Sequence, residues 1–367
     1  MSLALVVVAS LAVLGAAASA SAGHKPHKPK ASPSLHSGLD HAFIIMLENH
    51  SEASVIDERG PDGQLLAPYM TQLAHTYAWA KNYYGVTHPS EPNYIAAITG
   101  STWGFQNDDL HVSDHPSIVD QLESHGMTWN AYMESIPEND KLAEVSPDGL
   151  YAIKHNPFAL MTDIRDNPAR MAHVKGYDQL QADLDAGTVG NFVWITPNLC
   201  NDLHGGIYAT VPGHPETPCP YNDVTGDAAD VILEHNADAF VKKTVQMIMS
   251  SPAWTENSAI FVTADENDYD ASNPDIGNWE SADGCCDSPY VPAGDPDISP
   301  NWPGGVYGGG RVPAILITTH SKHPFVSTTS YNHYSYLATL EKLWKLGYLE
   351  YAGDRANVPT MDDMFSH

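Results

Sequence analysis

The stretch HAFIIMLEN (residues 41–49) decides the fold, because an apolar run ends abruptly in a carboxylate and an amide, Glu48 and Asn49. An apolar run of this kind is typical of a strand that is buried on both faces of a parallel sheet. The stretch SAIFVTADEN (258–267) repeats the pattern and ends in Asp265 and Glu266. We therefore expect two central strands whose carboxyl ends carry polar side chains, where such sheets bind their ligands.

From residue 40 onward, apolar runs alternate with helix-like patterns, and no internal repeat interrupts them. The predicted strands are Ala42–Leu47, Thr128–Met133, Phe192–Thr196, Ala259–Thr263 and Val312–Thr318. The predicted helices are Pro68–Ala80, Asn93–Thr99, Ile118–His125, Ala228–Ser250 and Tyr334–Leu346. This alternation predicts an α/β fold, a three-layer α/β/α sandwich with a mostly parallel central sheet.

The charge of the chain limits its partners. The 367 residues include 17 Lys and Arg against 45 Asp and Glu, which gives a net charge of −28. Nucleic acids and anionic membrane surfaces attract cationic proteins, so neither is an expected partner. An anionic substrate would need a metal ion or local hydrogen-bond donors to overcome the repulsion.

The N-terminal region predicts export. Residues 1–22 contain the run LALVVVASLAVLGAAASASA, which ends in small residues with the A-x-A spacing of a signal-peptide cleavage site. We expect a secreted, extracellular protein without stable membrane insertion, and an uncleaved N-terminal anchor is the alternative. Residues 23–39 are rich in Pro, Lys and Ser and predict a flexible linker. The main domain would span 40–350, followed by a C-terminal tail at 351–367.

Two long irregular segments, 197–226 and 267–311, contain all four cysteines. An even number of cysteines in an exported protein favours disulfides. One possible pairing joins Cys200 to Cys219 and Cys285 to its neighbour Cys286, and another joins the two segments by two cross-links. Long loops in a compact domain are usually functional or cross-linked, so we expect them to form walls of a site, with 267–311 as a long loop or a small cap.

Ser90 lies in THPSEPNY (87–94), where Pro92 is compatible with the first turn of a helix. Free N–H groups at a helix start favour an anion, and a divalent ion would acidify the hydroxyl into a nucleophile for phosphoryl transfer. The alternative is a helix-capping serine without chemistry. The sequence has no G-x-S-x-G around Ser90 and no nucleotide-binding glycine motif after a strand.

Glu48, Asn49, Asp265 and Glu266 offer hard oxygen ligands near Ser90. Such a set suits a divalent ion, with Ca²⁺, Mg²⁺ or Mn²⁺ favoured. The alternative for each acidic pair is a solvated loop position. The recurrence of the pattern after two core strands favours the metal site.

A second polar cluster, Asn198 to His204, follows the strand Phe192–Thr196. His204 could protonate a leaving alcohol, since an unperturbed histidine has a pKa near ~6.5 and is charged in mildly acidic water. His333, at a predicted helix start, is a further candidate for this role. For both residues the alternative is an ordinary loop or surface histidine.

The chain resembles the metal-dependent phosphoesterase family of secreted bacterial and fungal acid phosphatases and phospholipases C, which has an alkaline-phosphatase-like α/β/α core. The resemblance makes 40–350 a phosphoesterase catalytic domain. The matching segments are FIIMLENHS (43–51), NYYGVTHPSEPNYIAAITGS (82–101), ITPNLCNDLHGG (195–206), IFVTADEND (260–268), GRVPAILIT (310–318) and YNHYSYLATLEKLWKLG (331–347).

The resemblance implies a role for each candidate residue. Ser90 would be the nucleophile and a metal ligand, with Asp202 and His204 as the other catalytic residues. The implied substrate-binding residues are His88, Asn201 and His333, and the remaining implied metal ligands are Glu48, Asn49, Asp265 and Glu266. The chain departs from the family pattern at Tyr269 and Asp270, where a glycine and an Asp-His pair are common, and at Gly205, where an acidic residue is common.

These observations lead us to expect a secreted acid phosphatase that hydrolyses small phosphate monoesters through a phosphoserine intermediate. The alternatives within the family are a phospholipase C-type phosphodiesterase and a phosphoinositide phosphatase. An acidic calcium-binding secreted module without catalytic activity is the alternative outside it.

Overall fold

The computed structural model describes residues 38–221, 228–268, 282–296, 298, 302–321 and 323–365. All of them belong to one unit of the chain, 33–367. The predicted signal peptide, most of the predicted linker, Tyr269 and Asp270 lie outside the described residues.

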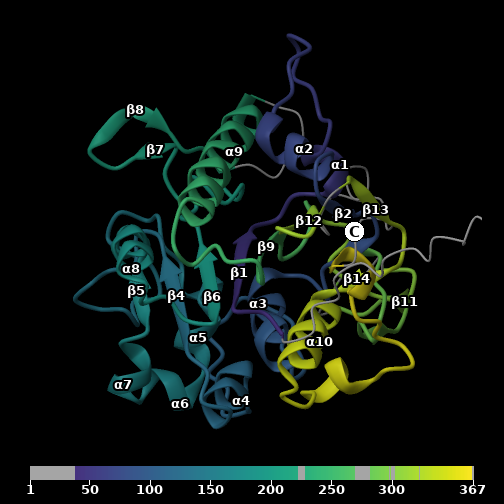
Figure 1. Cartoon of the computed structure of the whole chain (residues 1–367). Helices are drawn as coiled ribbons and strands as arrows, with labels where there is room; N and C mark the ends of the chain where they lie inside the picture. Colours follow the sequence, from purple (N-terminus) through teal and green to yellow (C-terminus); the bar gives the residue numbers. More distant parts are fainter. Residues whose placement is uncertain are drawn as a thin grey trace, which may run out of the picture. The chain divides into compact units, whose positions relative to one another are not determined.

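An eight-stranded sheet forms the middle layer (Figure 1). Its strand order is β13 (Phe325–Ser327), β2 (Ala78–Ala80), β12 (Ala314–Thr318), β9 (Ser258–Ala264), β1 (His41–Leu47), β6 (Phe192–Thr196), β4 (Trp129–Met133) and β5 (Val174–Gly176). Only β12 runs antiparallel to its neighbours, so the prediction of a mostly parallel sheet is confirmed. Because Leu47 of β1 pairs with Ala264 of β9, the chain leaves both strands side by side at Glu48 and Asp265.

Helices cover both faces of the sheet, which confirms the three-layer α/β/α prediction (Figure 1). One face carries α3 (Ser90–Thr99), α10 (His333–Trp344), α4 (Ile118–Ser124) and α5 (Pro157–Leu160). The other face carries α2 (Pro68–Ala74) and α9 (Ala228–Met249), which pack on each other. The remaining α-helices are α1 (Glu52–Val55), α6 (Thr162–Arg165), α7 (Pro168–Met171) and α8 (Leu180–Ala186).

Short elements complete the described chain. The 3₁₀ turns are η1 (Ile153–His155), η2 (Tyr177–Gln179), η4 (Glu350–Gly353) and η5 (Asp362–Phe365). Three two-stranded pairs lie outside the main sheet: β3 (Tyr83–Tyr84) with β14 (Tyr331–Asn332), β7 (Thr210–Val211) with β8 (His214–Pro218), and β10 (Tyr290–Val291) with β11 (Gly305–Val306).

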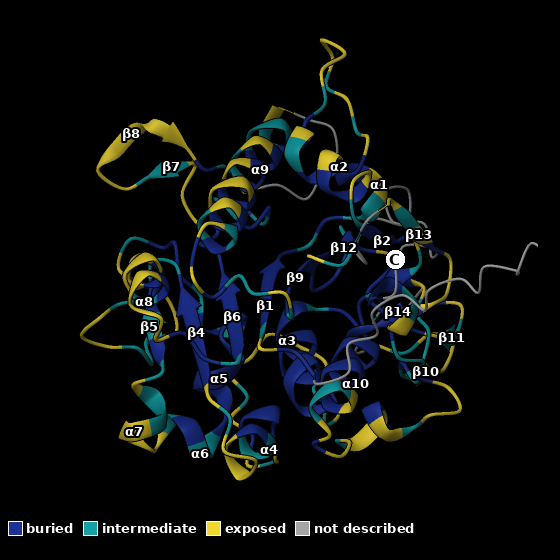
Figure 2. Ribbon diagram, in the orientation of Figure 1, coloured by how far each residue is buried: buried dark blue, intermediate teal, exposed yellow. Residues whose placement is uncertain are grey.

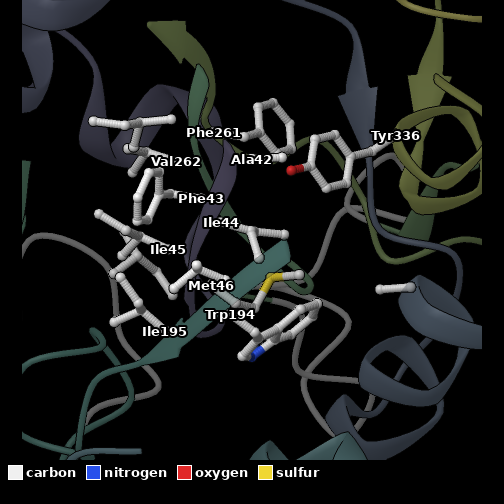
Figure 3. Close-up of a cluster of buried hydrophobic side chains, with 14 of the residues drawn as sticks. Ala42, Phe43, Ile44, Ile45, Met46, Trp194, Ile195, Phe261, Val262 and Tyr336 are labelled. Carbon is white, nitrogen blue, oxygen red and sulfur yellow. The ribbon is translucent and has the colours of Figure 1, made fainter. Parts of the chain in front are cut away.

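The core lies on both sides of β1. Figure 3 shows Phe43 and Ile45 pointing to one face of the sheet, and Ile44 and Met46 to the other. All four side chains are fully buried, as are the central strands coloured dark blue in Figure 2. Burial on both faces requires apolar side chains at successive positions, which explains the unbroken apolar run.

The predicted helix Pro68–Ala80 is wrong in its second half. The helix α2 ends at Ala74, and Ala78–Ala80 form strand β2 between β12 and β13. Pairing on both sides of this short segment overrides its local helical pattern. In contrast, α3 begins three residues earlier than predicted, at Ser90, because Pro92 fits within the first turn.

The cysteines pair as Cys200–Cys219 and Cys285–Cys286, the first of the two arrangements considered. The residues predicted as a C-terminal tail contribute Val358, Met361 and Met364 to the main core. Within the described residues, every helix is too short or too polar to cross a lipid bilayer.

Candidate active site

The carboxyl ends of β1 and β9 bring Glu48, Asp265 and Glu266 together. One carboxylate oxygen from each lies within 4.8 Å of the others, and all three side chains are buried. Ser90 Oγ lies 2.6 Å from Glu48 Oε1 and 2.9 Å from Glu266 Oε1. The structure therefore joins the predicted nucleophile to three of the predicted metal ligands.

Ser90 does not cap its helix. The N-cap of α3 is Pro89, and Ser90 is the first helical residue. Asn93 fixes the preceding loop, because its Oδ1 accepts bonds from the backbone N–H groups of Val86 and Thr87 while its Nδ2 donates to the Thr87 carbonyl. The capping alternative for Ser90 is thus wrong, and its hydroxyl is directed at the carboxylates instead.

The group formed by Glu48, Asp265 and Glu266 fits a divalent cation. Both carboxylate oxygens of Asp265 and the Oδ1 of Asn49 are buried without a hydrogen-bond partner among the described residues. Burial, with the nearby charges of Glu48 and Glu266, raises the pKa of Asp265 well above its usual range. The single proton of Ser90 cannot serve both carboxylates. A cation held by these oxygens would satisfy the orphaned atoms and offset the repulsion, and such a set is typical of Ca²⁺, Mg²⁺ or Mn²⁺.

His155 is a functional residue that the sequence analysis missed. Its Nε2 forms an ion pair with Glu48 Oε2, and its Nδ1 lies 3.7 Å from Asp202 Oδ2. Its ring stacks on Tyr94 of α3. Burial would raise the pKa of Glu48, but the charge and hydrogen bond of His155 hold it well below its usual range. His155 therefore keeps Glu48 ionised and oriented.

A helix-start signal could have drawn attention to His155. The stretch KHNP places Pro157 at the first position of α5 and Asn156 at its N-cap, where the Asn156 side chain accepts the Ala159 N–H. His155 is the last residue of η1, directly before this N-cap, and its side chain reaches Glu48 at the same edge of the sheet as Ser90.

A pocket of about 270 Å³ opens above Ser90. Asn49, His88, Ser90 and Glu266 line it, together with His204. His88 forms an ion pair with Glu266 through its Nδ1.

Lys154 also lines the pocket and was not predicted from the sequence. Its Nζ lies 2.7 Å from the Asp108 carboxylate, and neighbouring carboxylates, Glu48 first, raise its pKa against the effect of burial. Lys154 thus remains a cation and can contact an anionic substrate.

His204 faces the pocket but does not have an ordinary pKa. Burial, then the charge of Lys154, lowers the pKa of His204 to about 4, below the unperturbed value of about 6.5 at which the ring would be charged in mildly acidic water. Its Nδ1 lies 2.8 Å from the Gly205 carbonyl and must donate there, which leaves Nε2 as the acceptor of the neutral ring. The Asp202 carboxylate accepts the His204 backbone N–H and so positions this histidine.

Two predicted substrate-binding residues do not line the pocket. His333 is buried; its Nε2 donates to the Asp265 carbonyl at 2.6 Å, and its Nδ1 lies 3.1 Å from the Tyr83 hydroxyl. Asn201 donates to Glu134 at 2.9 Å. The structure therefore gives His333 a supporting position behind Asp265, a predicted metal ligand, and it leaves Asn201 outside the pocket.

Comparison with known proteins matches residues 64–214 and 227–347 to the Phosphoesterase family. The phosphate-repressible acid phosphatase of Penicillium chrysogenum is 26% identical over 314 residues, which cover 84% of this chain and 60% of the relative. The phosphatidylinositol-3-phosphatase of Mycobacterium tuberculosis is 25% identical over 328 residues, covering 89% of this chain and 82% of the relative. The chain thus spans about 60% of the length of the fungal relative.

A solved structure shows the same fold. The lipoteichoic acid synthase LtaP of Listeria monocytogenes superposes with a TM-score of 0.53 at 11% identity, over 90% of this chain and 76% of that chain. A protein of the alkaline phosphatase superfamily from Vibrio parahaemolyticus superposes with a TM-score of 0.51. Since the family match covers most of the sequence, the chain belongs to the Phosphoesterase family.

Proposed function

We propose that this protein is a secreted, metal-dependent acid phosphatase whose nucleophile is Ser90. The observation that carries the proposal is the position of Ser90 Oγ between Glu48 and Glu266 at the base of a pocket. A capping or surface serine would have no reason to lie between two buried carboxylates. The names of the fungal relatives support a phosphate monoester as substrate.

A divalent ion held by Glu48, Asn49, Asp265 and Glu266 would stabilise the ionised oxygen of Ser90 and the charge of the phosphate. Ser90 Oγ attacks phosphorus, and the ester bond to the leaving alcohol breaks on the opposite side. Lys154 binds the negative charge of the phosphoryl group from the wall of the pocket.

His204 moves the protons in both halves of the reaction. The negative charge of a bound phosphate ester raises the pKa of His204, so that its Nε2 takes up a proton from solvent and delivers it to the leaving alcohol, while the proton of Ser90 passes to solvent. The neutral ring then accepts a proton from the water that attacks the phosphoserine. Inorganic phosphate leaves, and His204 returns this proton to Ser90.

A phosphoinositide monoester is the second candidate substrate. The share of each relative that this chain covers favours a phosphoinositide over a phosphodiester substrate. The chain covers 82% of the M. tuberculosis phosphatidylinositol-3-phosphatase but only 38% of the hemolytic phospholipase C of Pseudomonas aeruginosa. Assays with phosphatidylinositol 3-phosphate and with bis-p-nitrophenyl phosphate, a diester, distinguish these alternatives from a general monoesterase.

The decisive experiment replaces Ser90 by alanine and follows p-nitrophenyl phosphate hydrolysis across pH, with and without EDTA. We expect acid-optimal activity in the wild type, its loss with EDTA, and a reduction of at least about 1,000-fold in Ser90→Ala, because removal of the nucleophile leaves only residual catalysis. Acid-quenched wild type should carry phosphate on Ser90 by mass spectrometry.

Ser117→Ala is the matched control, since Ser117 is a buried serine that caps α4 and lies outside the pocket. This variant should lose about 1 kcal/mol of stability and keep its activity. Turnover by Ser90→Ala within tenfold of wild type would exclude Ser90 as the nucleophile.

A further inference from the structure

A second cavity of about 440 Å³ adjoins the catalytic pocket. Gln106 and Ile298 line both spaces, so the cavity lies directly beside the pocket that contains Ser90. The cavity is formed by the segment after α3, the first turn of α10, the turn η4 and the loop that begins at Asp287. Figure 1 shows α3 and α10 side by side on one face of the sheet.

The walls of this cavity are aromatic and acidic. Trp103, Phe105, Tyr334 and Tyr351 line it, together with the carboxylate of Glu350. Among the described residues that line it, none is a lysine, arginine or histidine. The catalytic pocket contains Lys154 and two histidines beside the carboxylates of Asp108 and Glu266. The catalytic pocket thus has cationic donors for an anion, whereas the cavity suits an uncharged or cationic ring.

The aromatic walls are fixed to the helix that begins with Ser90. The Trp103 indole donates to Thr99 at the end of α3, and its ring stacks on His115. Phe105 stacks on His111, whose Nδ1 lies 2.7 Å from Glu91 in the first turn of α3. Rings held in this way lose little entropy when a ligand stacks on them.

The backbone around the cavity is strained. Trp103, Asp287 and Glu350 have φ values of 54°, 67° and 36°, and they are three of the eight non-glycine residues with positive φ in the described chain. A left-handed conformation is unfavourable for a residue with a side chain. Such conformations gather at ligand sites, where the surroundings hold them in place. Their concentration around one cavity supports a binding role.

We propose that this cavity binds the leaving alcohol of the substrate and selects a flat, ring-bearing alcohol that carries no negative charge. The proposal rests on the phosphatase function proposed above. With the phosphate at Ser90, an alcohol directed toward Gln106 and Ile298 would enter the adjoining cavity, and stacking on the aromatic walls would stabilise a ring there. Glu350 repels an alcohol with further phosphate or carboxylate groups.

The test compares 1-naphthyl phosphate, which has a ring, with ethyl phosphate, which has none. Tyr351 is 48% exposed, so Tyr351→Ala should fold. We expect the ratio of kcat/KM for naphthyl to ethyl phosphate to fall about threefold to tenfold in this variant, as expected for loss of one aromatic contact. Tyr348→Ala is the matched control, because Tyr348 is 44% exposed and does not line the cavity. An equal ratio in wild type and both variants would overturn the proposal.

Charge reversal provides an independent measurement. Glu350→Lys should raise kcat/KM for 4-carboxyphenyl phosphate relative to phenyl phosphate by several-fold, because the repulsion becomes an attraction. An unchanged ratio would show that Glu350 does not face the leaving group and would contradict the charge selection.

The two proposals can fail separately. Ethyl phosphate turnover by the wild type tests the phosphatase function without the cavity. If the wild type hydrolyses neither ester, calorimetric titration with 1-naphthol decides the matter. Binding that is lost in Tyr351→Ala but kept in Tyr348→Ala would support the cavity as a ring-binding site, whereas no binding to the wild type would overturn it.

Discussion

Two groups of ligand atoms meet at Glu48, and they differ in charge. In one group Glu48 meets Asp265 and Glu266, and in the other it meets His155 and Asp202. In both groups the ligand atoms lie within 4.8 Å of one another, and all the side chains are buried. By the criteria of distance and burial alone, each group would be a candidate metal site.

The charges of the side chains distinguish the two groups. The all-carboxylate group has no histidine among its three ligands; His88 pairs with Glu266 from outside it, but both oxygens of Asp265 lack hydrogen-bond partners among the described residues. In the other group His155 forms an ion pair with Glu48 and lies near Asp202. We therefore infer that the first group binds a cation at Asp265, whereas in the second group His155 supplies the positive charge and holds Glu48 in position.

The largest effect within this comparison should come from Asp265→Asn. We expect kcat/KM to fall at least about 100-fold and the metal concentration for half-maximal activity to rise. Even the mutation of a residue that only supports a metal ligand lowers metal affinity or activity roughly 10–100-fold. Activity titrations with Mg²⁺, Ca²⁺ and Mn²⁺ measure both quantities.

The stability of Asp265→Asn provides a second readout. In EDTA the variant should melt at a higher temperature than the wild type, because one of three mutually repelling carboxylates is gone. An unchanged metal requirement would exclude Asp265 as a ligand. A lower melting temperature in EDTA would show that the lost contacts of Asp265 outweigh the repulsion between the carboxylates.

His204→Gln should have the next largest effect, and the effect should depend on pH. Because burial lowers the pKa of His204 to about 4, the imidazolium is present below that pH and is lost above it. The kcat/KM of the metal-saturated wild type should therefore fall as pH rises through this range. The variant should lose this dependence and about 100-fold of the activity at pH ~4, the lower end of the range for a general acid.

The exposed His125 provides the control for this experiment, and His125→Gln should keep the wild-type pH profile. Parallel profiles for wild type and His204→Gln would show that another group donates the proton.

The sequence predicts the parts of the site that follow directly from buried strands. Glu48 and Asp265 come after unbroken apolar runs, and the β1–β9 register places them side by side. His155 follows no such run, and its contact with Glu48 depends on how η1 packs on Tyr94, which no local pattern reveals. The pKa of His204 could not be predicted either, because it depends on burial and on Lys154.

The fold, like the site, contains elements that the local sequence predicts and elements that depend on tertiary pairing. The burial of β1 on both faces can be predicted from its apolar composition. The strand Ala78–Ala80, in contrast, forms because it pairs with β12 on one side and β13 on the other. The sequence of such a three-residue strand does not differ from that of a continuing helix, so local sequence patterns cannot separate the two.

His155→Gln should have the smallest effect on activity and the opposite effect on stability. Loss of the ion pair leaves Glu48 buried without its charged partner, which costs about 3–5 kcal/mol in comparable sites, so the variant should melt at a lower temperature in EDTA. Saturating metal should restore part of this stability, because the ion supplies the missing charge, and kcat/KM should then be only about tenfold below wild type.

His75→Gln is the control, since His75 pairs with Asp57 on the surface and should contribute under about 1 kcal/mol. If His155→Gln instead behaves like Asp265→Asn, with higher stability in EDTA and a raised metal requirement, then both groups bind metal and the distinction between them is wrong.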